Sequence, residues 1–335
     1  MSLSATKVDG PPDADGELTT LLARALDLNA GIDSIARQQS PFVTLFPAEV
    51  LTLTLRDGRQ VRVFLKHLGP EQQPDQPDKQ RRDREVRVYE RLLRGDDHLP
   101  VVRYVGSRHD AHTCRQELYL EYVDDWSLQY HELEHWFTAA ARLAELHAHF
   151  AERASDLRAS EFLLELDHGY FAAWAGRAEA AVAKQSDELA GRIATLRARY
   201  APVGGLLAGQ PVTLVHNDLA CKNVIADRAT TPARICIIDW ELAGIGCGLL
   251  DLVHLKYGLD PANEAKMLAT YCARLRASSR LLPEDERQLA RLVAACELHK
   301  TLYRLAHSPA WNSPPATLAQ WMADSETFLR RVLGT

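Results

Sequence analysis

Hydrophobic and polar positions alternate in the first third of the chain, as they do in β-strands. Residues 50–55 and 61–66 each place an apolar side chain at every second position, and Asp57-Gly58 between them is a hairpin signal. Lys66 ends the returning strand on the face opposite its apolar side chains. On this segment alone, a solvated strand-end lysine and a cation projecting into a cleft are equally compatible.

The apolar spacing then changes from two residues to that of a helix. Residues 81–93 repeat apolar side chains at helical spacing, and Glu85 shares a helix side with Tyr89 at i+4. We therefore expect Glu85 to point inward. Glu90 is the alternative inward carboxylate, but Arg94 at i+4 offers it an ordinary surface ion pair.

Helical patterns dominate the rest of the chain. They cover residues 137–150, most of 163–200 and, as three helices, 261–333. Strand patterns before helical ones predict an α+β fold with a small β-rich N-terminal lobe and a large helical C-terminal lobe. The expected divisions are a polar, mobile tail over residues 1–17, a first lobe over 18–122 and a second lobe over 123–335.

Composition and charge narrow the classes of function. The 335 residues are 46% hydrophobic, enough for a sizeable core. A formal net charge of −6 gives no electrostatic footprint for a nucleic-acid partner. No apolar stretch reaches the roughly 18 residues of a membrane span, and the polar start has no secretory core segment. The sequence therefore predicts a cytoplasmic protein with no nucleic-acid or membrane partner, and its scattered cysteines are expected to be reduced.

Three polar side chains suited to phosphoryl transfer lie just beyond apolar, strand-like segments. They are Asp218 and Asn223 in the run 214–224 and Asp239 after residues 235–238. One carboxylate suits the acceptance of a hydroxyl proton, while an amide and a second carboxylate suit the binding of magnesium. This arrangement indicates a kinase with Asp218 as the base and Asn223 and Asp239 as metal ligands.

The motif His216-x-Asp218-x-x-x-x-Asn223, followed by Asp239-Trp240-Glu241, resembles the aminoglycoside phosphotransferase family. That family is a small-molecule branch of the protein-kinase-like superfamily. The resemblance implies a bilobal protein-kinase-like fold, ATP as the nucleotide with GTP left open, Mg²⁺, and a small hydroxylated acceptor. It also implies that Lys66 binds the α- and β-phosphates and is held by Glu85.

Other parts of the expected nucleotide site match the family's pattern less closely. The loop between the first two strands, residues 37–47, has no glycine, so Ser40 or Thr44 and backbone amides would have to cover the phosphates. Residues 118–123 are expected to run into the hinge, where backbone groups from Leu120 to Tyr122 would meet the purine edge. Lys222 is expected either to lie in solvent or to lie beside the transferred phosphoryl group.

Several alternatives compete with a small-molecule kinase. A protein kinase has a similar catalytic loop, but Asp239 is not followed by Phe-Gly and no Ala-Pro-Glu follows. The missing glycine loop keeps open a kinase-like binding module or pseudokinase. His131-Glu-Leu-Glu-His135 fits the zinc-protease pattern, yet the metzincin extension is missing. The glycines of residues 244–248 lack the third Rossmann glycine and predict a tight turn before Asp251.

Charge patterning gives an expectation for the acceptor. Residues 121–170 contain eleven Asp/Glu against three Arg, a local net charge of 3 − 11 = −8. This segment is either a solvated helix face or a wall that attracts a cation. The second reading predicts a hydroxylated acceptor that bears an amine, such as an amino sugar. In the same segment, His147 resembles the family's core histidine on the helix beneath the catalytic loop.

Overall fold

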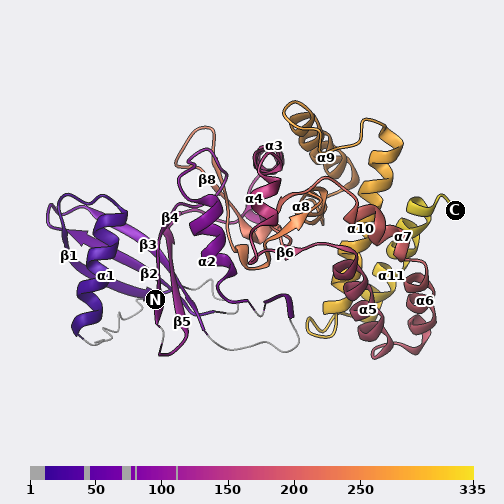
Figure 1. The fold of residues 1–335 in the computed structure, drawn as a ribbon, viewed down its shortest axis with the longest axis horizontal. Helices are drawn as coiled ribbons and strands as arrows, with labels where there is room; N and C mark the ends of the chain where they lie inside the picture. The colour runs from indigo at the N-terminus through magenta and orange to yellow at the C-terminus, as the bar shows by residue number, and fades with distance from the viewer. Residues whose placement is uncertain (1–11, 41–45, 70–76, 80, 111) are drawn as a thin grey trace. The chain divides into compact units, whose positions relative to one another are not determined.

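The computed structural model describes residues 12–40, 46–69, 77–79, 81–110 and 112–335 (Figure 1). The chain divides into two compact units. We call residues 1–126 with 225–241 the sheet unit, and residues 127–224 with 242–335 the helical unit. The fold class is as predicted, an α+β chain with an antiparallel sheet in its N-terminal part and helices in its C-terminal part.

The sheet unit is built on five antiparallel strands in the order β1-β2-β3-β5-β4. The predicted hairpin is present, and Leu53 pairs with Val61 across it. The edge strand β4 has no counterpart in the prediction, because its polar and apolar residues do not alternate regularly. The strands are β1 Ile32–Gln39, β2 Ala48–Leu55, β3 Gln60–Leu68, β4 Tyr104–Asp110 and β5 Arg115–Glu121.

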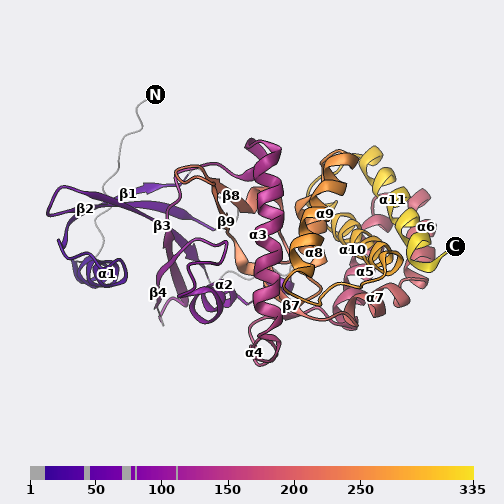
Figure 2. The ribbon, with the colours of Figure 1, turned by 90° about the horizontal axis from the view of Figure 1, so that it is seen from above.

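Helix α1, Pro12–Ala25, covers one face of this sheet (Figures 1 and 2). Its Leu18 and Leu22 are buried against strand residues that include Leu53 and Val63. The tail predicted over residues 1–17 overlaps this helix at residues 12–17, and its mobility stays a prediction. These residues lead into an apolar helix stripe that the sheet buries.

The predicted helix over residues 81–93 begins later and changes type. The α-helix α2 covers Arg84–Val88, and a π-helical turn, η2, covers Tyr89–Leu93. The inward orientation expected for Glu85 is present, since this side chain is 2% exposed.

The sheet unit also takes in a hairpin that the sequence assigned to the second lobe. Strands β8, Val224–Asp227, and β9, Arg234–Ile237, pair with each other. The backbone N–H of Ile237 donates to the carbonyl of Pro100 at 2.7 Å. Because of this long-range pairing, residues 225–241 group with the N-terminal part and not with residues 123–335.

In the helical unit, α3 packs against α9, and a second group of helices packs around α10. This helix contacts α5, α7, α8 and α11. The three C-terminal helices expected over residues 261–333 are present. No helix in the described part of the chain is long and apolar enough to cross a membrane. The helices are α3 Leu133–Ala151, α4 Ala154–Arg158, α5 His168–Ala183, α6 Asp187–Ala198, α7 Ala201–Ala208, α8 Leu249–Leu255, α9 Pro261–Arg276, α10 Glu286–His307 and α11 Pro315–Leu333; a small sheet contains β6 Leu164–Glu165, β10 Gly244–Gly246 and β7 Thr213–Val215.

The glycines at 244 and 246 lie in strand β10 and not in the predicted tight turn. A Cβ atom at Gly244 would lie 2.5 Å from the Leu166 side chain and 2.7 Å from the Leu164 carbonyl oxygen. The glycine is thus required for the close approach of β6 to β10.

Gly248, at the start of α8, gives a test of this packing. Its Gly248→Ala variant would place a Cβ 2.6 Å from Nδ1 of His147, so we expect a loss of about 1–3 kcal/mol from overpacking. The matched control is Gly191→Ala in α6, where nothing lies within 4 Å of the new Cβ and a gain of up to about 1 kcal/mol is expected. Urea unfolding measures both, and equal midpoints for the two variants would contradict the packing.

Candidate active site

A cluster of three charged side chains forms in the sheet unit. Lys66 on β3 donates from Nζ to Oε2 of Glu85 on α2 at 2.6 Å and to Oδ1 of Asp239 at 2.6 Å. The Lys66 side chain is 14% exposed, Glu85 2% and Asp239 26%. Three distant segments therefore meet at one lysine, and the contact between Lys66 and Glu85 that the resemblance implied is present.

The opposite charges of this cluster change the pKa values of its members. Burial disfavours the charged lysine, but the carboxylates of Asp239, Glu85 and then Glu241 outweigh it and raise the pKa of Lys66. Lys66 is therefore a fixed cation. Burial raises the pKa of Glu85 in spite of the opposing pull of Lys66. The more exposed Asp239 is thus the carboxylate with better access to a ligand.

Asp239 adopts a left-handed backbone conformation, with φ of 69°. Non-glycine residues rarely occupy this region, and such conformations persist where the surrounding structure holds them. The segment after Asp239 is held in this way. Trp240 is fully buried, Lys79 forms an ion pair with Glu241, and the Arg84 guanidinium donates to the Glu241 carbonyl at 2.7 Å.

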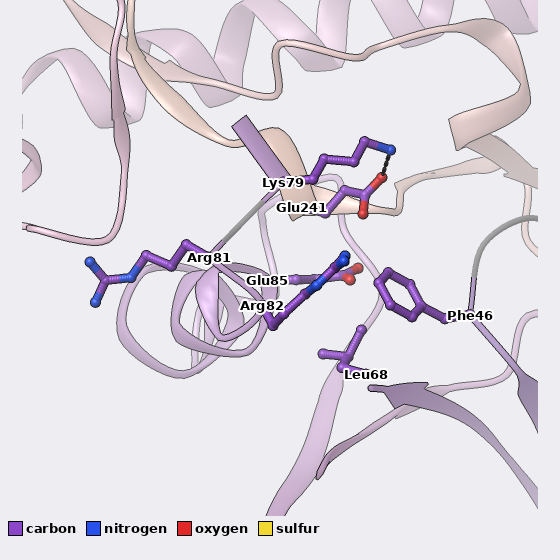
Figure 3. A pocket seen from close by; sticks show the side chains of 7 residues that line it. All are labelled: Phe46, Leu68, Lys79, Arg81, Arg82, Glu85 and Glu241. Atoms are coloured by element: carbon purple, nitrogen blue, oxygen red, sulfur yellow. Dashed lines mark hydrogen bonds and ion pairs between the residues drawn. The ribbon is translucent and has the colours of Figure 1, made fainter. Parts of the chain in front are cut away.

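A small pocket adjoins this cluster (Figure 3). Two cations lie near the Phe46 ring, with Nζ of Lys66 5.7 Å and Cζ of Arg82 5.0 Å from its centroid. Glu85 and Glu241 also line the pocket, so it combines both signs of charge with an apolar wall. The lining residues are Phe46, Leu68, Lys79, Arg81, Arg82, Glu85 and Glu241.

The other expected nucleotide contacts also belong to the sheet unit. Ser40 is buried directly after β1, and its backbone N–H donates to the Ala48 carbonyl at 2.8 Å. Thr44 lies outside the described residues. Leu120 is buried in β5, and Tyr122 follows with the Arg62 guanidinium 4.6 Å from its ring centroid. Their contacts with a nucleotide remain predictions.

In the helical unit, hydrogen bonds between neighbouring residues stabilise the loop that carries Asp218. The Asp218 carbonyl accepts from the Ala220 backbone N–H at 2.8 Å and from Nδ2 of Asn223 at 2.9 Å. The single turn Cys221–Asn223 follows. Because Asn223 uses its nitrogen for this bond, its amide oxygen is the atom left to act as an acceptor. Amide and carboxylate oxygens suit Mg²⁺, so the side chains of Asn223 and Asp239 each fit the predicted metal by their chemistry.

Asp251 fixes the backbone of this loop from helix α8. Its carboxylate accepts from the backbone N–H groups of His216 at 2.7 Å and Asn217 at 2.8 Å, and Nε2 of His147 lies 3.3 Å away. Tyr271 in turn lies 2.7 Å from Nδ1 of His147. Burial opposes the ionisation of Asp251, but His147 and the neighbouring cations lower its pKa. His147 thus lies beneath the loop, where the sequence placed it.

A buried lysine that the sequence did not identify supports the loop from the other side. Lys300 on α10 is 1% exposed, and its Nζ donates to the Asn217 carbonyl at 2.6 Å and to Oδ1 of Asn217 at 3.2 Å. Asn217 has φ of 67° and also donates to the Tyr170 hydroxyl at 2.8 Å. Burial lowers the pKa of Lys300 to about 8. The sequence has no local signal for this role, because Lys300 stands between His299 and Thr301 in a helix of mixed composition.

The remaining predicted residues differ in accessibility. Lys222 is exposed, so both its expected roles stay open. Cys221 is half-buried, and burial raises the pKa of its thiol, which argues against a nucleophile. The rings of His131 and His135 lie 5.5 Å apart, and no cluster of three or more His, Cys, Asp or Glu that suits a metal occurs in the described ranges.

Two features together define a small-molecule phosphotransferase of the protein-kinase-like fold. One is the sheet unit with its lysine–glutamate–aspartate cluster, and the other is the helical unit with its His-x-Asp loop. The chain matches the model of the phosphotransferase enzyme family, APH, over residues 47–292. It belongs to that family, as its motifs predicted. No curated protein matches the sequence closely enough to narrow this further.

Solved structures of low sequence identity have the same fold. A microcompartment-associated aminopropanol kinase is 19% identical, with 94% of this chain and 97% of the other covered and a TM-score of 0.56. The GDP complex of aminoglycoside 2′-phosphotransferase-IIIa is 14% identical, with 93% and 97% covered and a TM-score of 0.58. The ethanolamine kinase of Plasmodium vivax is 13% identical, with 89% and 82% covered and a TM-score of 0.55.

Proposed function

We propose that this protein is an ATP-dependent O-phosphotransferase that transfers the γ-phosphoryl group to a hydroxyl of a small molecule. GTP is the alternative nucleotide, since two similar structures are GDP complexes. The observation that carries the proposal is Lys66, held between Glu85 and Asp239 at 2.6 Å from each. This cluster and a partly exposed Asp218 in a loop that is fixed on both sides are parts that phosphoryl transfer uses, so they favour a kinase over a binding module.

In the proposed reaction, Asp218 orients the acceptor hydroxyl and accepts its proton. The acceptor oxygen forms a bond to the γ-phosphorus, the bond from that phosphorus to the β–γ bridging oxygen breaks, and a nucleoside diphosphate leaves. Lys66 holds the α- and β-phosphates, and Glu85 holds Lys66. Mg²⁺, bound through Asn223 and Asp239, would neutralise charge on the phosphates. Lys222, which is exposed, would lie beside the transferred group.

The test is nucleotide turnover with a panel of acceptors. ATP and GTP are each incubated with amino alcohols, amino sugars, antibiotics and simple sugars, and the phosphorylated product is identified by mass. Phosphorylation of any hydroxyl supports the proposal. Binding of nucleotide without turnover across the panel favours the kinase-like binding module.

The acceptor is proposed to carry an amine. Similar structures include kinases named for aminopropanol and ethanolamine, each an alcohol with an amine. The acidic segment over residues 121–170 supports this less strongly than its sequence implied, because arginines neutralise part of its charge. The ion pairs with arginines outside the segment are Glu121–Arg234, Asp124–Arg62, Asp125–Arg228 and Glu145–Arg274.

We expect amine-bearing acceptors to have higher kcat/KM than their N-acetylated forms. The difference should shrink at high salt, because the residual negative charge of the segment is screened within a Debye length of about 10 Å at 0.1 M. Both acceptor forms are measured at two ionic strengths. Equal values at both salt concentrations would remove the electrostatic argument and leave the acceptor open.

A further inference from the structure

A histidine beside the candidate base has no part in the chemistry described above. His254 lies on α8, and its Nδ1 is 3.9 Å from Oδ1 of Asp218. This nitrogen is buried and has no hydrogen-bond partner among the described residues. A buried polar atom without a partner costs about 1–3 kcal/mol, and a catalytic role is one of the explanations for such an atom.

Helix α8 presents its polar residues to the loop one after another. Asp251 accepts the backbone N–H groups of His216 and Asn217, and His254, three positions later on the same helix side, lies against the Asp218 carboxylate. One helix therefore fixes the backbone of the loop and reaches its reactive side chain. The Tyr303 ring, 6.4 Å from the imidazole, limits the space on the α10 side.

The imidazole is neutral at neutral pH. Burial, followed by the charges of Lys300 and Arg304 on α10 and of His216 and Lys222 on the loop, lowers the pKa of His254 well below its usual value. A neutral imidazole has one N–H and one acceptor nitrogen. Next to a carboxylate oxygen, the tautomer with its proton on Nδ1 is favoured, since the other tautomer would set two acceptors against each other.

We propose that His254 is a positioning residue, whose Nδ1–H donates to Oδ1 of Asp218 in the catalytic complex and leaves Oδ2 for the acceptor hydroxyl. This inference rests on the proposed phosphotransfer function. The 3.9 Å separation is about 1 Å longer than a formed bond, and catalytic hydrogen bonds often tighten only when substrate is bound. His254 keeps its proton throughout, so Asp218 remains the base.

Kinetics of three variants test the role of Nδ1. We expect His254→Ala to lower kcat/KM by about 10- to 100-fold, because a carboxylate displaced by 1 Å loses its alignment. The acid limb of the pH profile should also move to higher pH, a shift that purely structural damage would not produce. His254→Asn, whose amide nitrogen replaces Nδ1, should restore most activity, and His254→Gln, which mimics Nε2, should not. Unchanged kinetics in His254→Ala, or better rescue by Gln than by Asn, would overturn the proposal.

NMR of the ligand-free protein tests the contact without any acceptor. In protein labelled with ¹⁵N-histidine, the resonances absent from His254→Asn assign the ring. We expect a neutral ring with its proton on Nδ1, and a changed Nδ1 shift in Asp218→Asn. A proton on Nε2, or no response to Asp218→Asn, would contradict the contact even if His254→Ala fails to fold. Absence of phosphotransfer by the wild type would count against the proposed function alone, since the NMR result stands independently.

Discussion

The Asp218→Asn variant is expected to lose most turnover while nucleotide binding survives. Groups that orient or deprotonate a hydroxyl contribute about 10²–10⁴ in rate, or about 2.7–5.4 kcal/mol of activation free energy. Asparagine keeps the shape of the side chain but cannot accept the proton. The loop should hold its conformation, because its backbone is fixed by Asp251 and Lys300 and its internal bonds use the Asp218 carbonyl.

Single-turnover rates and nucleotide titrations distinguish this outcome from general damage. The same substitution at Asp156, a residue of α4 with a side chain 61% exposed, is the matched control and should leave both quantities unchanged. If Asp218→Asn retained more than half of the wild-type rate, Asp218 would not be the base. A parallel loss of nucleotide affinity and thermal stability would instead indicate a structural role.

Local signals explain what the sequence could predict. The hairpin between β2 and β3 follows from alternation around Asp57-Gly58, and it orients Lys66 without reference to the rest of the chain. The spacing of residues 81–93 indicated the inward side of the helix and therefore Glu85. The motif around Asp218 is recognisable locally, because its internal hydrogen bonds join residues within a six-residue span. In each case the relevant contacts are near in sequence or repeat at a fixed period.

Contacts distant in sequence explain what the sequence could not predict. Residues 225–241 group with the sheet unit because Ile237 pairs with Pro100, and neither segment signals the other. Lys300 supports Asn217 from 83 positions away, and on its own helix it has no special pattern. His254 likewise gains significance only from the loop beside it. The functional importance of a buried polar residue depends on its partner, which periodicity does not reveal.

The Asp239→Ala variant is expected to reduce kcat/KM by more than about 100-fold. Asp239 is proposed to bind the metal directly, and the loss of a direct metal ligand lowers activity more than the loss of a residue that only orients such a ligand. The fold should survive, since Lys66 keeps Glu85 at 2.6 Å and Glu241 keeps its bonds to Lys79 and Arg84. Activity of the wild type should require Mg²⁺ or Mn²⁺, and a chelator should abolish it.

Asp239 has two proposed partners, and two further variants separate them. Asp239→Asn should raise the Mg²⁺ concentration needed for half-maximal activity, because an amide binds this cation less strongly than a carboxylate. Lys66→Met should instead weaken nucleotide binding and leave the metal dependence unchanged. Asp33→Ala, an exposed change on β1, is the matched control. Full wild-type activity in excess chelator, or an unchanged metal requirement in Asp239→Asn, would show that Asp239 acts through Lys66 and not through a metal.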